Sequence, residues 1–189
     1  MKKLLSIAVA LAGMLAFTAV HAQGDMKNEK TVEVGGAPMY PSKNIIENAV
    51  NSKDHTTLVA AVKAAGLVET LQGAGPFTVF APTNEAFDKL PKGTVETLVK
   101  PENKAKLTGI LTYHVVAGRL GTKELDEWIK KGNGTAELTT VAGGKLWVMK
   151  KGGKYMLKDE NGGMATITIS NVYQSNGVIH VIDHVVLPK

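Results

Sequence analysis

Three residues near the C-terminus have side chains that could bind a metal ion or exchange protons: His180, Asp183 and His184. They lie in the segment GVIHVIDHVVLPK, residues 177–189, in which the two histidines are four positions apart. On a helix, histidines with this spacing share a face and can bind one zinc ion. A histidine near a carboxylate can also act as a general acid or base. The spacing therefore allows a metal site or a catalytic pair, and the conformation of the segment decides between these and a structural role.

The composition of this segment predicts a buried β-strand. Its apolar residues occupy both alternating sets of positions, which is typical of a strand covered on both faces. Four residues of a strand span about 13 Å, whereas a zinc–nitrogen bond is about 2 Å long, so the two histidines do not share a metal ion. Asp183 is expected on the opposite face from both. We predict no metal site, a hydrogen-bonded His180 inside the protein and a more peripheral His184.

Two further histidines, His55 and His114, could serve as functional groups. His114 lies in the apolar segment LTYHVVAG, and it is either a buried imidazole satisfied by its neighbours or the partner of Asp183 or Asn84 in a site. The sequence leaves both alternatives open. His55 lies in the polar segment KDHTT at the start of a helix and is expected in solvent.

Nucleophile and cofactor motifs are missing from the sequence. The chain has no cysteine and no serine in a G-x-S-x-G context, which disfavours hydrolase chemistry. Its glycine pairs match neither the phosphate-loop nor the dinucleotide-binding pattern, so they are expected to form turns. We predict no cofactor.

A lysine-rich segment near residue 150 has two interpretations. Gly152 and Gly153 predict a tight hairpin turn. Lysines on the flanking strands could protect an exposed sheet edge from aggregation, which is the favoured interpretation, or could bind an anionic polysaccharide or a membrane surface. We call this segment the lysine hairpin; its lysines are Lys145, Lys150, Lys151, Lys154 and Lys158.

The elements that position these residues change in kind along the chain. Between residues 42 and 74, apolar residues recur every three or four positions, which predicts short amphipathic helices. Residues 77–81 predict a strand that Pro82 ends, and Thr83 can cap a short helix after it. Further helices are expected over 101–111 and 122–131, and only short strands from residue 135 onward. This segregation of helices and strands predicts an α+β fold.

The N-terminus indicates export. Residues 1–22 combine two lysines, an apolar run and a small-residue exit, which is typical of a cleaved signal peptide. Residues 23–40 are polar and are expected to be a flexible leader, and residues 41–188 the folded domain. We therefore expect a periplasmic or secreted protein with no membrane span after cleavage. Removing Lys2 and Lys3 lowers the formal charge from +5 to +3, which with a single arginine argues against a nucleic-acid partner.

Three segments taken together resemble a known family. GPFTVFAPTNEAF (residues 75–87), LTYHVVAG (111–118) and SNGVIHVIDHVVLP (175–188) are similar to the first conserved block, the tyrosine-histidine block and the second conserved block of the fasciclin domain family, in the same order and with similar spacing. The resemblance extends over about residues 40–188 and is closest to the single-domain secreted bacterial type. It implies a β-sandwich wedge with a layer of short helices.

The resemblance also implies site residues and a function. Thr83 and Asn84 would close the turn after the first-block strand, and Tyr113 and His114 would be the pair implicated in ligand contact in animal members. The residues that would organise the last strand and the turn before it are Asn176, His180 and Asp183. We expect an exported, non-enzymatic adhesion or binding module that contacts surface proteins, extracellular polysaccharide or itself. The alternatives are a periplasmic small-ligand or metal-binding protein and, less favoured, a hydrolase.

Overall fold

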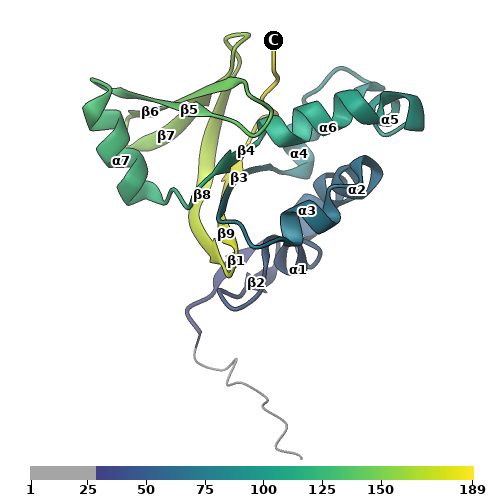
Figure 1. The fold of residues 1–189 in the computed structure, drawn as a ribbon, viewed down its shortest axis with the longest axis horizontal. Helices are drawn as coiled ribbons and strands as arrows, with labels where there is room; N and C mark the ends of the chain where they lie inside the picture. The colour runs from purple at the N-terminus through teal and green to yellow at the C-terminus, as the bar shows by residue number, and fades with distance from the viewer. Residues whose placement is uncertain (1–28) are drawn as a thin grey trace, which may run out of the picture.

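A computed structural model describes residues 29–189, and the expected signal peptide lies outside this range. One seven-stranded sheet, with the strand order β4-β3-β9-β8-β7-β6-β5, forms the centre of the molecule (Figure 1). Its strands are β3 (Phe77–Pro82), β4 (Val115–Ala117), β5 (Thr135–Thr139), β6 (Lys145–Lys151), β7 (Lys154–Lys158), β8 (Met164–Gln174) and β9 (Gly177–Ile182). Strands β3 and β9 are parallel, and all other neighbours are antiparallel.

The sheet bends until its two edge strands nearly meet. Strand β8 is irregular between Ile167 and Val172, where its pairing with β9 shifts register twice. Such bulges bend a strand and increase its twist. At the far side, Val116 in β4 forms an isolated bridge with Thr140, which directly follows β5, and the Val141 amide donates to the Val115 carbonyl over 2.7 Å. The two layers of the expected wedge are therefore halves of one folded sheet.

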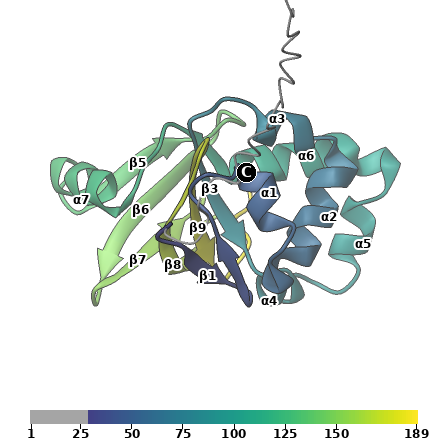
Figure 2. The same cartoon turned by 90° about the horizontal axis from the view of Figure 1, so that it is seen from below.

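The helices are distributed unequally around the sheet. Figure 2 shows α7 beside strands β5–β7, and the other helices grouped on the opposite side, next to β3 and β9. The α-helices are α1 (Ile45–Ala49), α2 (Thr56–Ala65), α3 (Val68–Gln72), α4 (Asn84–Asp88), α5 (Thr94–Leu98), α6 (Lys104–Tyr113) and α7 (Thr122–Lys131), with short 3₁₀ turns η2 (Lys53–His55) and η3 (Pro101–Asn103). None of the helices between residues 29 and 189 is long and apolar enough to cross a bilayer.

Two hydrophobic cores share the central strands. Along β3, Val79 and Ala81 face the core beneath the helices, whereas Phe80 faces the core enclosed by the folded sheet. This alternation follows from the two-residue period of a strand. Strand β8 contributes to both cores, with Val172 in the first and Ile167 in the second. The α+β class expected from the sequence is confirmed.

Local signals account for several of these elements. Thr83 caps α4 by accepting a hydrogen bond from the Ala86 amide, as predicted. The turn between β6 and β7 uses Gly152 and Gly153 at φ angles of 57° and 78°. A two-residue hairpin turn of type I′ requires positive φ at both positions, which glycine adopts without a steric penalty.

Two predictions about chain ends are wrong. Within the segment expected to be a flexible leader, β1 (Val32–Val34) and β2 (Ala37–Met39) form a hairpin whose Val34 and Met39 side chains are buried in the first core. The last strand ends at Ile182 and does not continue to Leu187. Its partner β3 ends at Pro82, opposite Ile182, and the chain then turns into α4, so pairing on that side stops. On the other side, the Asp183 amide still donates to the Thr166 carbonyl of β8 over 3.1 Å.

Candidate functional site

The His180 side chain lies in the protein interior, where both ring nitrogens form hydrogen bonds. It is fully buried and stacks on Phe80 with ring centroids 5.7 Å apart. Its Nε2 atom donates to the Leu120 carbonyl over 2.8 Å, and its Nδ1 atom accepts from the Asn171 amide over 3.4 Å. Burial lowers its pKa, against the effect of the Leu120 carbonyl. His180 is therefore neutral near pH 7 and connects β9 to two other segments.

Tyr113 and His114 are buried in the same way at the end of α6. The Tyr113 hydroxyl donates to the Lys145 carbonyl over 2.5 Å and accepts from the Glu160 amide over 3.2 Å. His114 donates from Nδ1 to the Ile110 carbonyl over 2.8 Å and accepts at Nε2 from the Val186 amide over 3.2 Å. Burial raises the Tyr113 pKa to about 12. Both side chains are buried and connect the end of α6 to segments distant in the sequence.

The buried histidines predict a loss of stability in mild acid. Burial lowers the pKa of His114 to about 4, whereas an unfolded histidine has a pKa of about 6.5. The unfolded chain therefore binds more protons between these values, so stability is complete above pH 6.5 and falls as the pH decreases towards 4. We expect His114 alone to lower the free energy of unfolding by about 2 kcal/mol at pH 5 relative to pH 7. Urea unfolding at the two pH values measures this difference.

Two variants serve as controls for this acid sensitivity. His114→Gln should unfold with a weaker pH dependence than the wild type, because it removes the buried titrating group. His184→Gln should retain the wild-type dependence, since His184 is exposed. Equal slopes in all three proteins would show that the acid sensitivity arises elsewhere.

Asn176 joins three segments at the turn before β9. Its Oδ1 atom accepts from the Ile45 amide over 3.0 Å, and its Nδ2 atom donates to the Leu71 and Gly73 carbonyls, each over 2.8 Å. The side chain is buried. One amide group thus connects the start of α1 and the end of α3 to the sheet.

Asn84 performs a similar function at the start of α4. Its Oδ1 atom accepts from the Thr57 amide over 3.1 Å and from the Thr56 hydroxyl over 3.2 Å, and its Nδ2 atom donates to the Lys53 carbonyl over 2.8 Å. Together with the Thr83 cap, these contacts connect the end of β3 to η2 and α2. Thr83 and Asn84 therefore form a structural junction between β3, α4 and the start of α2.

Asp183 and His184 lie beyond the last strand. The prediction that Asp183 faces away from both histidines is wrong, because its Oδ1 atom lies 2.9 Å from His184 Nδ1. The same carboxylate accepts from the Thr166 amide over 2.6 Å. Partial burial raises the Asp183 pKa, but the hydrogen bonds from His184 and Thr166 outweigh it and leave the pKa below its usual value. His184 is exposed, whereas His180 is buried among other partners, so the structure separates the two histidines.

No metal site is formed by the part of the chain that the structure describes. Residues 29–189 contain no group of three or more histidine, aspartate or glutamate side chains placed to hold an ion. His114 contacts neither Asn84 nor Asp183, because its two ring nitrogens bond to Ile110 and Val186.

The lysine hairpin differs from the expected sheet edge. Strands β6 and β7 lie inside the sheet order, and the edges are β4 and β5. Only the tip extends beyond the neighbouring strands, since β5 pairs with β6 up to Met149 and β8 pairs with β7 from Met156 onward. Lys145 pairs with Glu137 over 2.9 Å and Lys150 with Asp126 over 3.1 Å. The lysines that remain exposed without a described ion-pair partner are Lys151, Lys154 and Lys158.

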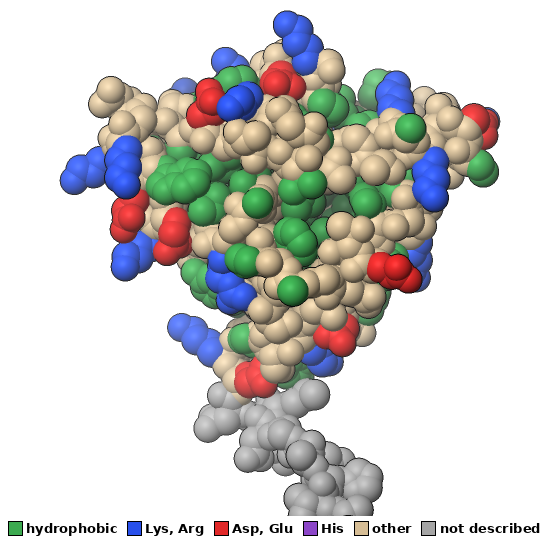
Figure 3. Space-filling view, viewed as in Figure 1, with side chains coloured by type: hydrophobic (Ala, Val, Ile, Leu, Met, Phe, Trp, Pro, Cys, Tyr) green, Lys and Arg blue, Asp and Glu red, His purple; other side chains and the backbone are tan. Residues whose placement is uncertain are grey.

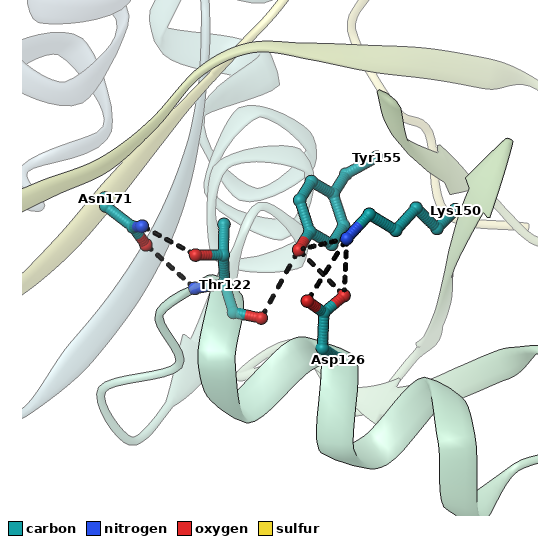
Figure 4. Close-up of polar contacts among 5 residues, drawn as sticks. All are labelled: Thr122, Asp126, Lys150, Tyr155 and Asn171. Carbon is teal, nitrogen blue, oxygen red and sulfur yellow. Dashed lines mark hydrogen bonds and ion pairs between the residues drawn. The ribbon is translucent and has the colours of Figure 1, made fainter. Parts of the chain in front are cut away.

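A polar network beside this hairpin was missed by the sequence analysis (Figure 4). Asn171 accepts from the Thr122 amide over 2.8 Å and donates to the Thr122 hydroxyl over 2.6 Å. Asp126 accepts from the Tyr155 hydroxyl over 2.8 Å and pairs with Lys150. The network fixes α7 against β7 and β8. The two-glycine turn could have revealed that Lys150 lies opposite Tyr155, but no local signal places Asp126 beside them.

Comparison with known proteins assigns the chain to a family. A model of the fasciclin domain matches residues 53–188. The chain belongs to the fasciclin domain family. The predicted resemblance is therefore confirmed. The three similar segments, residues 75–87, 111–118 and 175–188, all lie within the matched range.

Relatives support the family assignment, and a solved structure supports the fold. Protein sll1483 of Synechocystis sp. is 44% identical over 180 residues, which cover 95% of this chain and 93% of the relative. Immunogenic protein MPB70 of Mycobacterium bovis is 36% identical over 145 residues, which cover 74% of this chain and 66% of the relative. A FAS1 domain pair from the insect cell adhesion molecule fasciclin I has a similar fold, with a TM-score of 0.70 at 19% identity, over 78% of this chain and 52% of that chain.

Proposed function

We propose that this fasciclin domain is an exported, non-enzymatic adhesion module whose lysine hairpin contacts an anionic polysaccharide at the cell surface or in the matrix. The main support is that the polar side-chain atoms of Tyr113, His114 and His180 form hydrogen bonds with backbone groups inside the protein. A general acid or base must reach a substrate proton, and these buried groups do not. These contacts favour a structural role for the three residues and recognition by other residues on the surface.

The nature of the relatives supports a role outside the cell. Cell surface glycolipoprotein MPB83 of Mycobacterium bovis is 37% identical over 145 residues, which cover 74% of this chain and 58% of the relative. The signal-like sequence of residues 1–22 supports export. Cell fractionation followed by N-terminal sequencing of the mature protein tests this part of the proposal.

The exposed lysines favour an anionic partner. Lys151 and Lys154 face each other across the protruding tip, and Lys158 lies at the other end of β7. Positive side chains on a protruding hairpin attract a polyanion by long-range electrostatics, and salt weakens this attraction. A repeating acidic polysaccharide can contact several of them at once, which increases the apparent affinity.

Binding to immobilised alginate tests the contact. The wild type should be retained at low salt and released as the ionic strength rises. The triple variant Lys151→Gln, Lys154→Gln, Lys158→Gln should bind at least about tenfold more weakly, because charge complementarity is lost. A matched triple variant that removes exposed lysines from the helical side should bind like the wild type; it carries Lys92→Gln, Lys100→Gln and Lys106→Gln. Failure of the wild type to bind, or equal loss in both variants, would overturn the polysaccharide assignment.

A further inference from the structure

An apolar groove opens on the helical side of the molecule. Its walls are α2 and α3 on one side and the end of α6 on the other, and β3 forms part of its floor. In the space-filling view, hydrophobic side chains gather in a hollow near the centre of this face (Figure 3), in the region that Figure 1 shows between α6 and α3. Its cavity volume is about 70 Å³. Representative lining residues are Leu58, Val59, Val62, Leu71, Val79 and Leu111.

One polar side chain lining the groove has an unused hydrogen-bonding atom. His55, expected in solvent, is only 2% exposed, because η2 turns it towards β3. Its Nδ1 atom lies 2.9 Å from the Ser52 hydroxyl. Its Nε2 atom is buried, and although the Ala81 carbonyl lies near the ring, this atom forms no hydrogen bond of normal geometry with residues 29–189. Burial lowers the pKa of His55, against the effect of the nearby Ala81 carbonyl, so the ring is neutral near pH 7. Most buried polar atoms in folded proteins are paired, so this atom requires an explanation.

The chemistry of the lining restricts the occupant. Apart from Lys63, every lining residue is uncharged at neutral pH, so a charged ligand would lose its hydration without gaining a partner. A peptide in extended form would bring backbone groups that this lining cannot pair. Ligand sites are commonly apolar with a few polar groups that fix orientation. An uncharged molecule with an apolar body and one polar group fits these conditions.

Size and hydrogen bonding restrict the ligand further. An engineered cavity of about 150 Å³ in another protein accommodates benzene, so the smaller volume here favours a slim chain over a ring. The half-exposed Val141 side chain continues the apolar lining to the rim, where a longer chain can extend. A hydroxyl both donates and accepts, so it can pair with Nε2 in either neutral tautomer of His55.

We propose that this groove is a binding site for an uncharged aliphatic alcohol, whose chain lies against α2, α3 and β3 and whose hydroxyl hydrogen-bonds His55 Nε2. The site goes beyond the adhesion function and uses none of the residues of the lysine hairpin. The two proposals therefore succeed or fail separately.

The first experiment titrates the full chain, in its mature form, with 1-hexanol and follows the backbone amide signals by NMR. Shifts should concentrate on α2, α3 and β3. Val59→Trp, which fills the groove from α2, should raise the Kd for 1-hexanol at least about tenfold, because the indole occupies ligand space. Val99→Trp makes the same substitution at an exposed position outside the lining and should leave the Kd unchanged. Shifts elsewhere, or equal Kd values for both variants, would overturn the site.

The second experiment tests the hydroxyl contact. His55→Phe should raise the Kd for 1-hexanol about fivefold, the scale of one lost hydrogen bond, and should leave the Kd for n-hexane unchanged or lower. His184→Phe is the matched control on the surface and should change neither. Equal weakening of both ligands would overturn the role of His55. Concentration-dependent shifts of the groove signals without ligand, together with a dimer in sedimentation, would assign the groove to a second copy of the chain and overturn the proposal.

Discussion

His114→Ala is expected to lower the free energy of unfolding by about 3–5 kcal/mol at pH 7. The substitution deletes a fully buried ring and leaves the Ile110 carbonyl and the Val186 amide without their side-chain partner. A buried polar group without a partner costs about 1–3 kcal/mol, and the cavity adds to this. Urea unfolding followed by circular dichroism measures the change.

An exposed histidine supplies the control for His114. His184→Ala should alter stability by less than about 0.5 kcal/mol, as is usual for surface substitutions. A His114→Ala protein that remains as stable as the wild type but no longer binds alginate would contradict the structural role and would place His114 in the recognition surface.

Asn176→Ala is expected to lower the free energy of unfolding by about 2–4 kcal/mol. The change removes three hydrogen bonds, which leaves the Ile45 amide and the Leu71 and Gly73 carbonyls unpaired by this side chain. The loss should be accompanied by faster hydrogen exchange at the start of α1 and in α3, because both depend on this contact.

Another asparagine on the surface provides the comparison. Asn51 donates one hydrogen bond to the Glu47 carbonyl and is exposed, so Asn51→Ala should cost less than about 1 kcal/mol. Equal destabilisation by the two substitutions would indicate that the buried junction contributes no more than an ordinary surface contact.

The parts of the fold that the sequence predicted are those with a local signal. The apolar run of residues 77–81 predicted β3, and Thr83 predicted the helix that follows it. The paired glycines at 152 and 153 predicted the hairpin, since positive φ angles at consecutive positions are a local requirement. Burial of His180 followed from the apolar residues on both sides of it.

The parts that were wrong depend on contacts between distant segments. His55 has polar neighbours in the sequence, and its burial results from packing against β3. Strand β9 ends at Ile182, opposite Pro82, the last residue of its partner β3. The C-terminal segment alone carries no signal for this limit. The three-residue strands β1 and β2 are too short to show a period. The burial of Val34 and Met39 and the hydrogen bond from the Lys53 amide to the Gly35 carbonyl connect them to the domain, and all of these contacts are with distant segments.

The central strands shared by the two cores affect how the domain unfolds. Strands β3 and β9 place alternate side chains in the two cores, and β8 contributes one part of its length to each. We therefore expect that neither core can come apart while the other keeps its packing. The helical layer and the folded sheet therefore gain and lose their order together. We therefore expect partly open forms that expose β3 or β9 to another chain to be rare, and this protection does not depend on a disulfide, since the chain has no cysteine.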